Sequence, residues 1–270
     1  MTKIAVMADV HGNVTALAAA LADAQAQGAT QIWLLGDLLM PGPGGAELFE
    51  LIAAYGVRLL VRGNWEDILF KGLAQGYTDN FKHRYFTRLA RFIGAQLTPA
   101  QLATLRALPL TATRSLAGLQ VSVSHNQPAQ NWGPALMPAA EQAHFDALVP
   151  PTADLALYAH THHQLLRYTS HEQPIINPGS VGMPVANWPR HPYDHRARYA
   201  LMTLANEHLG DLAFRRVDYD VATEAHRATE AGLPYLELYL DQLQTGTIHT
   251  YDEAALTRLN AQYDATDPLA

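Results

Sequence analysis

The chain of 270 residues contains no cysteine. This absence excludes disulfide bonds, thiolate metal sites and a cysteine nucleophile, and it is compatible with a reducing compartment. Basic residues are also few, with 18 lysines and arginines against 25 acidic residues and a formal net charge of −7. Such a chain has no general attraction for nucleic acid or for an anionic membrane, so any phosphate-bearing ligand must be held locally.

Long hydrophobic runs are absent as well. No run approaches the roughly 18 residues of a membrane span, and the first residues, MTKIAVMADVHGN, hold too few apolar residues for a secretory signal. We therefore expect a cytoplasmic protein with no membrane partner. Hydrophobic residues still make up 49% of the chain, which favours one large domain with an appendage.

The N-terminal part of the chain alternates apolar runs with helical stretches. Residues 3–8, 31–37 and 57–64 are predicted strands, and the stretches 14–28 and 46–56 are predicted helices. This alternation indicates an α/β sheet. Each apolar run ends on a polar residue able to bind metal, at the strand end where open α/β sheets place their ligands. These three residues are Asp9, Asp37 and Asn64.

The remainder of the chain predicts a second sheet and a helical tail. Residues 65–113 are helical, charged and aromatic, and we expect them to cover the sheet. A helix is expected near 139–148, strands at 119–125, 154–163, 165–169 and 174–182, and a terminal hairpin from 199–206 and 212–220. The expected organisation is one domain over residues 1–218 and a helical C-terminal extension over residues 219–270.

Five short fragments supply residues suited to metal binding. In chain order they are Asp9-Val10-His11-Gly12-Asn13, Gly36-Asp37, Gly63-Asn64, His125 and His160-Thr161-His162. Oxygen and imidazole donors without sulfur suit Mn, Fe, Zn or similar ions better than a structural zinc site. Two cations about 3.5–4 Å apart need a shared anionic ligand, for which Asp37 is the natural candidate.

The local spacing adds detail to this prediction. Alternate residues of an extended segment point the same way, so the pair His160 and His162 should converge on one cluster. The glycines at 12, 36 and 63 are expected to leave room for metal, water or phosphate near the backbone. Taken singly, each fragment has a simpler explanation as a polar turn or a structural histidine. Their joint occurrence after strand-like runs favours a metal centre.

The order of these motifs resembles the calcineurin-like metallophosphoesterase superfamily, whose signature is D-x-H, G-D, G-N-H-D/E, a lone H and G-H-x-H. The resemblance covers roughly residues 1–218 and implies a four-layer α/β/β/α sandwich of two mixed sheets. It also implies two metal sites that share Asp37. One metal would be bound by Asp9, His11, Asp37 and His162, and the other by Asp37, Asn64, His125 and His160.

Two positions depart from that signature. Trp65 stands where many members have the histidine expected to protonate the leaving group, although Glu66 keeps the acidic position after it. Ala159 replaces the glycine of G-H-x-H, a change that should leave the ligands in place. The segment NPGSVG at 177–182 is similar to the small bacterial and archaeal phosphodiesterase branch. The Gly-Asn-Trp-Glu-Asp run and the helical tail look similar to a Gram-positive group related to asymmetrical diadenosine tetraphosphate hydrolases.

The resemblance implies a phosphoesterase with two divalent or trivalent metal ions. A hydroxide that bridges the metals would attack phosphorus in a phosphodiester or phosphoanhydride, with Asp37, Asn64 and His125 as catalytic residues. Mn and Fe are favoured, and Zn, Ni and Mg also fit. We expect a small phosphorylated substrate, a nucleotide above all, with diadenosine tetraphosphate as a candidate.

Other side chains have two interpretations each. Asn13 and Arg62 are candidate phosphate contacts, although a structural ion pair explains Arg62 equally well. Trp65 could stack on a nucleobase, but packing against the helical segment is the simpler alternative. Three further histidines are not counted among the ligands. His163 should point to the opposite face if its segment is extended, which favours a structural or supporting role. His191 and His195 could border the cleft, but a solvated loop is the simpler expectation.

Two other classes of function remain as alternatives. The fold could serve as an interaction scaffold with a vestigial metal site, although retention of all seven candidate ligands argues against this. A nuclease acting on polymeric nucleic acid is disfavoured by the acidic charge and the lack of a basic stripe. The residues leave open the physiological substrate, the native metals, the leaving-group acid and the oligomeric state.

Overall fold

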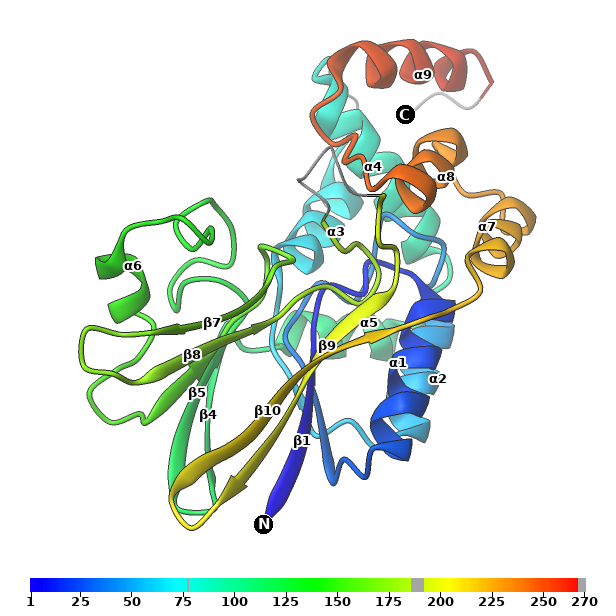
Figure 1. The fold of residues 1–270 in the computed structure, drawn as a ribbon. Coiled ribbons are helices and arrows are strands. Elements are labelled where there is room, and N and C mark those ends of the chain that lie inside the picture. Colours follow the sequence, from blue (N-terminus) through cyan, green and yellow to red (C-terminus); the bar gives the residue numbers. More distant parts are fainter. Residues whose placement is uncertain (77, 186–191, 267–270) are drawn as a thin grey trace.

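The computed structural model describes residues 1–76, 78–185 and 192–266 (Figure 1). Two five-stranded sheets lie face to face at its centre. The first has the order β10 (His208–Val217), β9 (Ala197–Ala205), β1 (Thr2–Met7), β2 (Gln31–Leu34) and β3 (Leu59–Leu60). The second has the order β4 (Thr111–Leu116), β5 (Leu119–Ser124), β6 (Leu155–Leu157), β8 (Pro174–Pro178) and β7 (Gln164–Tyr168). Both sheets mix parallel and antiparallel pairs.

The side chains of β1 are buried on both faces of the sheet, which explains why its sequence is a continuous apolar run. Ile4 and Val6 face the core between the two sheets, whereas Ala5 and Met7 face the core beneath the helices. Successive side chains of a strand point to opposite faces, so a strand covered on both faces must be apolar throughout. The N-terminal sequence therefore encodes a central strand.

Helices cover the outer faces of both sheets, which gives the α/β/β/α sandwich predicted from the sequence. The helices on the first sheet share one apolar core with its outward side chains: α1 (Val14–Ala26), α2 (Ala46–Ala54), α3 (Asn64–Ala74), α4 (Phe81–Gly94) and α5 (Pro99–Ala107). The second sheet is covered by the short α6 (Gln142–Asp146), whose Phe145 packs against Tyr158.

The sequence-based strand limits differ from the structure at several places, of which three matter for the site and the sheets. The predicted strand 57–64 is reduced to the two residues of β3, and the predicted strand 154–163 ends at Leu157, where a turn begins. The segment 65–113 was expected to be helical, but β4 begins at Thr111 and pairs antiparallel with β5. Because β4 is an edge strand with mostly exposed side chains, it lacks the apolar pattern that would have revealed it.

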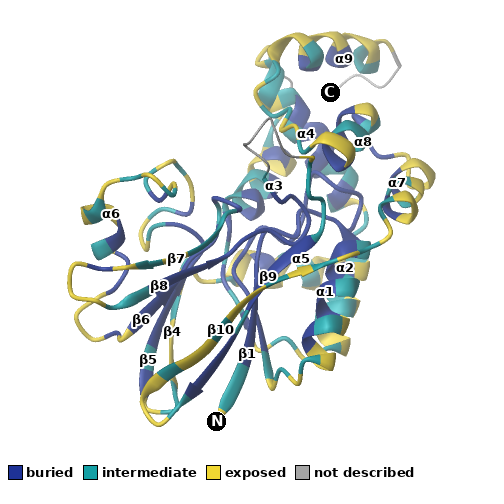
Figure 2. Cartoon of the chain, viewed as in Figure 1, coloured by how far each residue is buried: buried dark blue, intermediate teal, exposed yellow. Residues whose placement is uncertain are grey.

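The C-terminal part forms α7 (Val221–Glu230), α8 (Leu236–Thr245) and α9 (Glu253–Thr266). These helices share the core of the first sheet's helical layer, and Figure 2 shows that exposed residues line the outer sides of α7 and α9. Pro234 lies between α7 and α8, where its missing N–H and fixed φ disfavour a continuous helix. Within the described residues, no helix is long and apolar enough to cross a membrane.

A buried carboxylate joins α7 to the start of α1. Glu224 is completely buried, and its Oε2 accepts hydrogen bonds from the backbone N–H of Thr15 at 3.0 Å and from the Thr15 hydroxyl at 2.6 Å. Its Oε1 accepts a further hydrogen bond, at 3.0 Å, from the hydroxyl of Tyr239 on α8. The same helix start is capped by Asn13, whose Oδ1 accepts from the N–H of Ala16.

Replacement of Glu224 tests how much this carboxylate contributes to the stability of the contact between the C-terminal helices and α1. We expect Glu224→Ala to lower the free energy of unfolding by about 1–3 kcal/mol, because buried donors lose their acceptor. Glu230→Ala is the matched control, since Glu230 lies on the same helix, is exposed and forms an exposed ion pair with His226. Urea unfolding of both variants checks the difference. Equal stability of the two would contradict this role of Glu224.

Candidate metal centre

The candidate ligands come together at the carboxyl ends of strands from both sheets. Asp9 follows β1, Asp37 follows β2, and His125 follows β5 directly. His160 and His162 lie in the turn after β6, and Asn64 is the first residue of α3. Residues that are about 150 positions apart in the chain therefore meet, as the contact between His11 and His162 shows.

The backbone at five candidate ligands is in the left-handed region. The φ angles, all between 52° and 64°, belong to Asp9, His11, Asp37, His160 and His162. For residues other than glycine this conformation costs roughly 1–2 kcal/mol each. Sharp turns, and not the side-chain alternation of an extended segment, therefore direct His160 and His162 toward the cluster. The sequence-based reason for their convergence was wrong in this respect.

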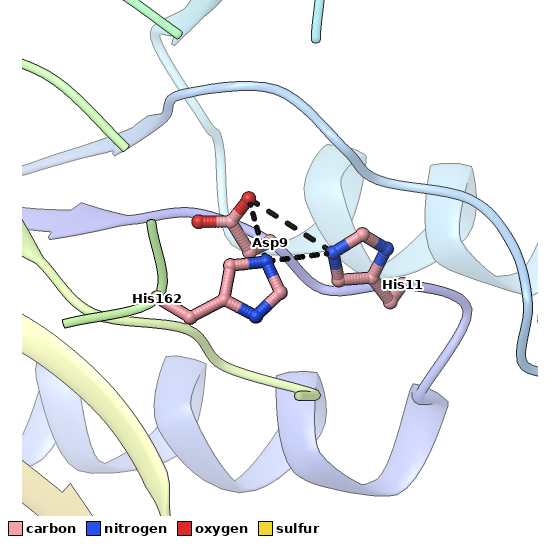
Figure 3. Close-up of side chains that lie close together, drawn as sticks. All are labelled: Asp9, His11 and His162. Carbon is pink, nitrogen blue, oxygen red and sulfur yellow. Dashed lines mark hydrogen bonds and ion pairs between the residues drawn. The ribbon is translucent and has the colours of Figure 1, made fainter. Parts of the chain in front are cut away.

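The first group contains Asp9, His11 and His162, which point toward one another in Figure 3. The Oδ1 of Asp9 lies 3.4 Å from Nε2 of His162 and 3.9 Å from Nε2 of His11. This oxygen is buried and has no hydrogen-bond partner among the described residues. The other carboxylate oxygen, Oδ2, accepts from the backbone N–H of His160 at 3.2 Å.

Backbone carbonyl groups orient both imidazole rings of this group. Nδ1 of His11 lies 2.8 Å from the oxygen of Met40, and Nδ1 of His162 lies 2.6 Å from the oxygen of Met183. Because a carbonyl oxygen only accepts, each Nδ1 must carry the proton, which leaves Nε2 of a neutral ring with a free lone pair. The two Nε2 atoms are only 3.1 Å apart. Two lone pairs at that distance repel, so either a proton or a metal ion between the two nitrogens is needed to hold them together.

The second group contains Asp37, His125 and His160. The Oδ2 of Asp37 lies 3.2 Å from Nε2 of His125, whose Nδ1 donates to the oxygen of Leu35 at 2.6 Å. The same Oδ2 lies 3.8 Å from Nε2 of His11, so this oxygen is within reach of both groups. Its partner Oδ1 accepts from the backbone N–H of Trp65 at 2.8 Å. Asp37 therefore stands between the two groups.

Asn64 completes the second group. The side-chain oxygen of Asn64 lies 3.1 Å from Nε2 of His125, 2.8 Å from Nδ1 of His160 and 3.3 Å from Oδ2 of Asp37. An oxygen in this place faces only acceptors, and either a cation or a reversed amide satisfies it. A ligand role for Asn64 stays a prediction.

The pKa values of the histidines respond in opposite directions to this setting. Burial lowers the pKa of His11 and of His160 to about 4. Burial acts in the same direction on His125, but the carboxylates of Asp37 and Asp9 outweigh it and raise that pKa to about 10. The buried carboxylates thus draw positive charge to the centre, which a bound cation supplies equally well.

Glu66 supports the centre without pointing into it. Its buried carboxylate accepts hydrogen bonds from the backbone N–H groups of Asp37 at 3.0 Å, Leu38 at 2.8 Å and Gly63 at 2.7 Å. Burial, together with the nearby charge of Asp37, raises the pKa of Glu66 to about 7. The sequence analysis assigned no role to Glu66. Its position three residues after the helix N-cap Gly63 was the available signal, because an acidic residue there caps helices.

The segment NPGSVG supports the centre from the other sheet. The Ser180 hydroxyl donates to the oxygen of Asp9 at 2.7 Å, and the Asn177 amide donates to the oxygen of Ala159 at 2.8 Å. From the sequence, this segment was expected only to mark the resemblance. The signal for a structural role was a polar residue, Asn177, at the end of an otherwise apolar strand, with Ser180 two residues after that strand.

The glycines of the motifs do not provide space for a ligand, contrary to our expectation. A Cβ at Gly63 would lie 2.1 Å from Oδ1 of Asp37, and a Cβ at Gly36 would lie 2.7 Å from Nδ1 of His125. A Cβ at Gly12 would meet the backbone of Gly42 at 2.5 Å. The neighbouring site loops fill the space, so these positions require glycine because the loops approach one another closely.

A cleft of about 800 Å³ opens from the centre. Trp65 lines it, and the indole packs edge-on against His11 and Phe86, with ring centroids 5.4 and 5.5 Å away. Asn13 and Arg62 are not among its lining residues. Asn13 is buried, and its side-chain amide donates to the hydroxyl of Tyr219 at 3.1 Å. The Nε of Arg62 lies 3.4 Å from Oδ1 of Asp67, within the range of an ion pair. Phosphate contacts by Asn13 and Arg62 stay predictions.

The three remaining histidines have different surroundings. His163 lines the cleft, and its Nδ1 contacts the oxygen of Thr161, so the expectation that it faces away from the site was wrong. The reason is the turn at 158–163, in which side chains do not alternate. His195 packs edge-on against Tyr219, 6.0 Å between ring centroids. His191 lies outside the described residues.

Comparisons with known proteins agree with this geometry. A family model described as a calcineurin-like phosphoesterase superfamily domain matches residues 2–207. An uncharacterized protein from Methanocaldococcus jannaschii is 26% identical over 250 residues, which cover 86% of this chain and 94% of that protein.

Two solved structures share the fold over nearly their whole length. A hypothetical protein from Pyrococcus horikoshii has a TM-score of 0.73 at 21% identity, covering 92% of this chain and 99% of that chain. A metallophosphoesterase from Sphaerobacter thermophilus has a TM-score of 0.69 at 26% identity, covering 91% of this chain and 100% of that chain. Since the family model spans most of the chain and every candidate ligand, this protein belongs to the calcineurin-like phosphoesterase superfamily and is a metal-dependent phosphoesterase.

Proposed function

We propose that the enzyme uses two metal ions to hydrolyse a phosphodiester or phosphoanhydride bond of a small phosphorylated substrate. Asp9, His11 and His162 hold one ion, the second group holds the other, and Asp37 contributes to both. The second group consists of Asp37, His125, His160 and Asn64. One observation carries this proposal: in each of the two groups, one carboxylate oxygen and two imidazole nitrogens lie within 4.8 Å of one another, with all donor residues buried or nearly so.

The donor set suits the proposed ions. Carboxylate, amide and imidazole donors without sulfur favour Mn and Fe, and they also accept Zn, Ni or Mg. When bound, such ions lower the pKa of water and neutralise phosphoryl charge. The protein orients the donors, because the carbonyl groups of Met40, Met183 and Leu35 fix three imidazole rings. Asp37, Asn64 and His125 are the residues we assign to catalysis.

The substrate that we favour is a nucleotide, with diadenosine tetraphosphate as one candidate. The cleft volume of about 800 Å³ is at the upper end of the range for sites that enclose a small organic ligand. Trp65 offers an indole ring at the wall next to His11. A small-molecule substrate also agrees with the net charge of −7, which does not attract polymeric nucleic acid. The cytoplasmic location stays a prediction.

Removal of single ligands tests the dinuclear assignment. We expect Asn64→Ala and His125→Ala to lower Mn-dependent hydrolysis of bis(p-nitrophenyl) phosphate by more than the roughly 10- to 100-fold that loss of an outer-shell partner costs. Metal analysis of the purified variants should show loss of one bound ion. His195→Ala, outside both groups, is the control and should keep both metal and activity. Full activity of the first two variants would refute the assignment.

The identity of residue 65 leads to a prediction about leaving groups. An indole does not supply a titratable proton, so the alkoxide of a poor leaving group receives little help from Trp65. We expect kcat/KM for thymidine 5′-phosphate p-nitrophenyl ester to exceed that for the dinucleotide TpT by at least about a hundredfold, the low end of what a general acid contributes. Steady-state kinetics on both substrates measures the ratio. Similar values would show that another group protonates the leaving oxygen.

A further inference from the structure

The cleft extends along α3, away from the metal centre. Asn64, Ile68 and Lys71 all line it, at positions i, i+4 and i+7 of this helix. This spacing defines one face of a helix, and seven residues correspond to roughly 10 Å along the axis. The cationic end of Lys71 therefore belongs to a part of the cleft beyond the candidate metal ligands.

A second lysine lines the same region from α4. Lys82 lies in the first turn of α4, and its Nζ is 6.0 Å from the ring centroid of Phe86, one turn further along. Lys71 and Lys82 also line together an adjoining hollow of about 290 Å³. The two lysines therefore border one continuous space, although they come from different helices.

The C-terminal extension supplies part of the wall around Lys82. Ile248, Thr250 and Tyr251, from the connection between α8 and α9, line the cleft. The Nζ of Lys82 lies 4.5 Å from the ring centroid of Tyr251, within the range of a cation–π contact. The extension is thus joined to the cleft through a charged group.

Neither lysine is neutralised by an acidic side chain. Over residues 1–76, 78–185 and 192–266, no carboxylate forms an ion pair with Lys71 or Lys82. Asp67 is an acidic residue of α3 that lies between Asn64 and Lys71. Its Oδ1 forms an ion pair with Nε of Arg62 at 3.4 Å, and its Oδ2 accepts a hydrogen bond from the side-chain amide of Asn131 at 2.9 Å. The chain as a whole has a net charge of −7. Because Lys71 and Lys82 form no ion pair with a described carboxylate, this end of the cleft is locally positive and favours binding of an anion.

We propose that Lys71 and Lys82 form a subsite for a second phosphate group of the substrate, remote from the phosphate at the metal centre. This inference rests on the proposed function, because it takes one phosphate of the ligand to be at the metals. A monophosphate ester leaves this end of the cleft without a complementary charge. The ligand class that satisfies both ends is a polyphosphate chain, as in nucleoside or dinucleoside polyphosphates.

Competition between inorganic phosphates tests the subsite. The double variant Lys71→Gln/Lys82→Gln is compared with Arg58→Gln/Arg114→Gln, which removes two positive charges outside the cleft. Tripolyphosphate and orthophosphate are used as inhibitors of bis(p-nitrophenyl) phosphate hydrolysis at fixed free Mn²⁺. We expect the inhibition constant of tripolyphosphate to rise roughly tenfold in the lysine variant, about 1.4 kcal/mol. The inhibition constant of orthophosphate and the kcat/KM of the ester should stay within about twofold.

The outcomes separate this inference from the proposed function. Unchanged tripolyphosphate affinity in the lysine variant, or an equal loss for orthophosphate, would overturn the subsite. An equal rise in the arginine variant would show a general effect of net charge and would also overturn it. If the wild-type enzyme does not hydrolyse the ester with Mn²⁺, the proposed function fails. Calorimetric titration of the Mn-loaded proteins with tripolyphosphate then decides on the subsite independently of turnover.

Discussion

The buried carboxylate of Glu66 holds together the two loops that carry Asp37 and Asn64. Three backbone N–H groups, from the ends of two different loops, donate to its oxygens. Burial removes competition from water for these hydrogen bonds. The position of Asp37 between the two groups of candidate ligands therefore depends on a residue that binds the backbone of the site loops and is not itself a candidate ligand. The position of Asp37 also requires glycine at position 63, because the Cβ of any other residue there would collide with the Asp37 carboxylate.

The candidate centre also requires backbone conformations that most residues avoid. Five ligand positions lie in the left-handed region, and the surrounding hydrogen bonds must offset their cost. Ser180 and Asn177 supply some of these bonds from the second sheet. The result is a set of side chains with little freedom to adjust, which is what a preorganised metal site needs.

The sequence was informative where strands are buried on both faces and end on a polar residue. Such runs revealed the first sheet, and the motif order revealed the family, because both signals are local. The edge strand β4 was missed since its side chains are mostly exposed and lack an apolar pattern. Contacts between loops that are distant in the sequence determine the hydrogen bonds of Glu66 and Asn13 and the position of His163 in the cleft. A single sequence contains no direct record of such contacts.

The contact between Lys82 and Tyr251 joins the cleft to a stretch of chain that contains none of the candidate ligands. All of these ligands precede residue 163, whereas the wall around Lys82 includes residues 248–251. A change in the length or composition of this connection would reshape the cleft without displacing any strand of either sheet. The architecture therefore separates the part of the chain that carries the candidate metal ligands from a part that lines the far end of the cleft. The range of accepted substrates can diverge while the hydrolytic centre stays constant.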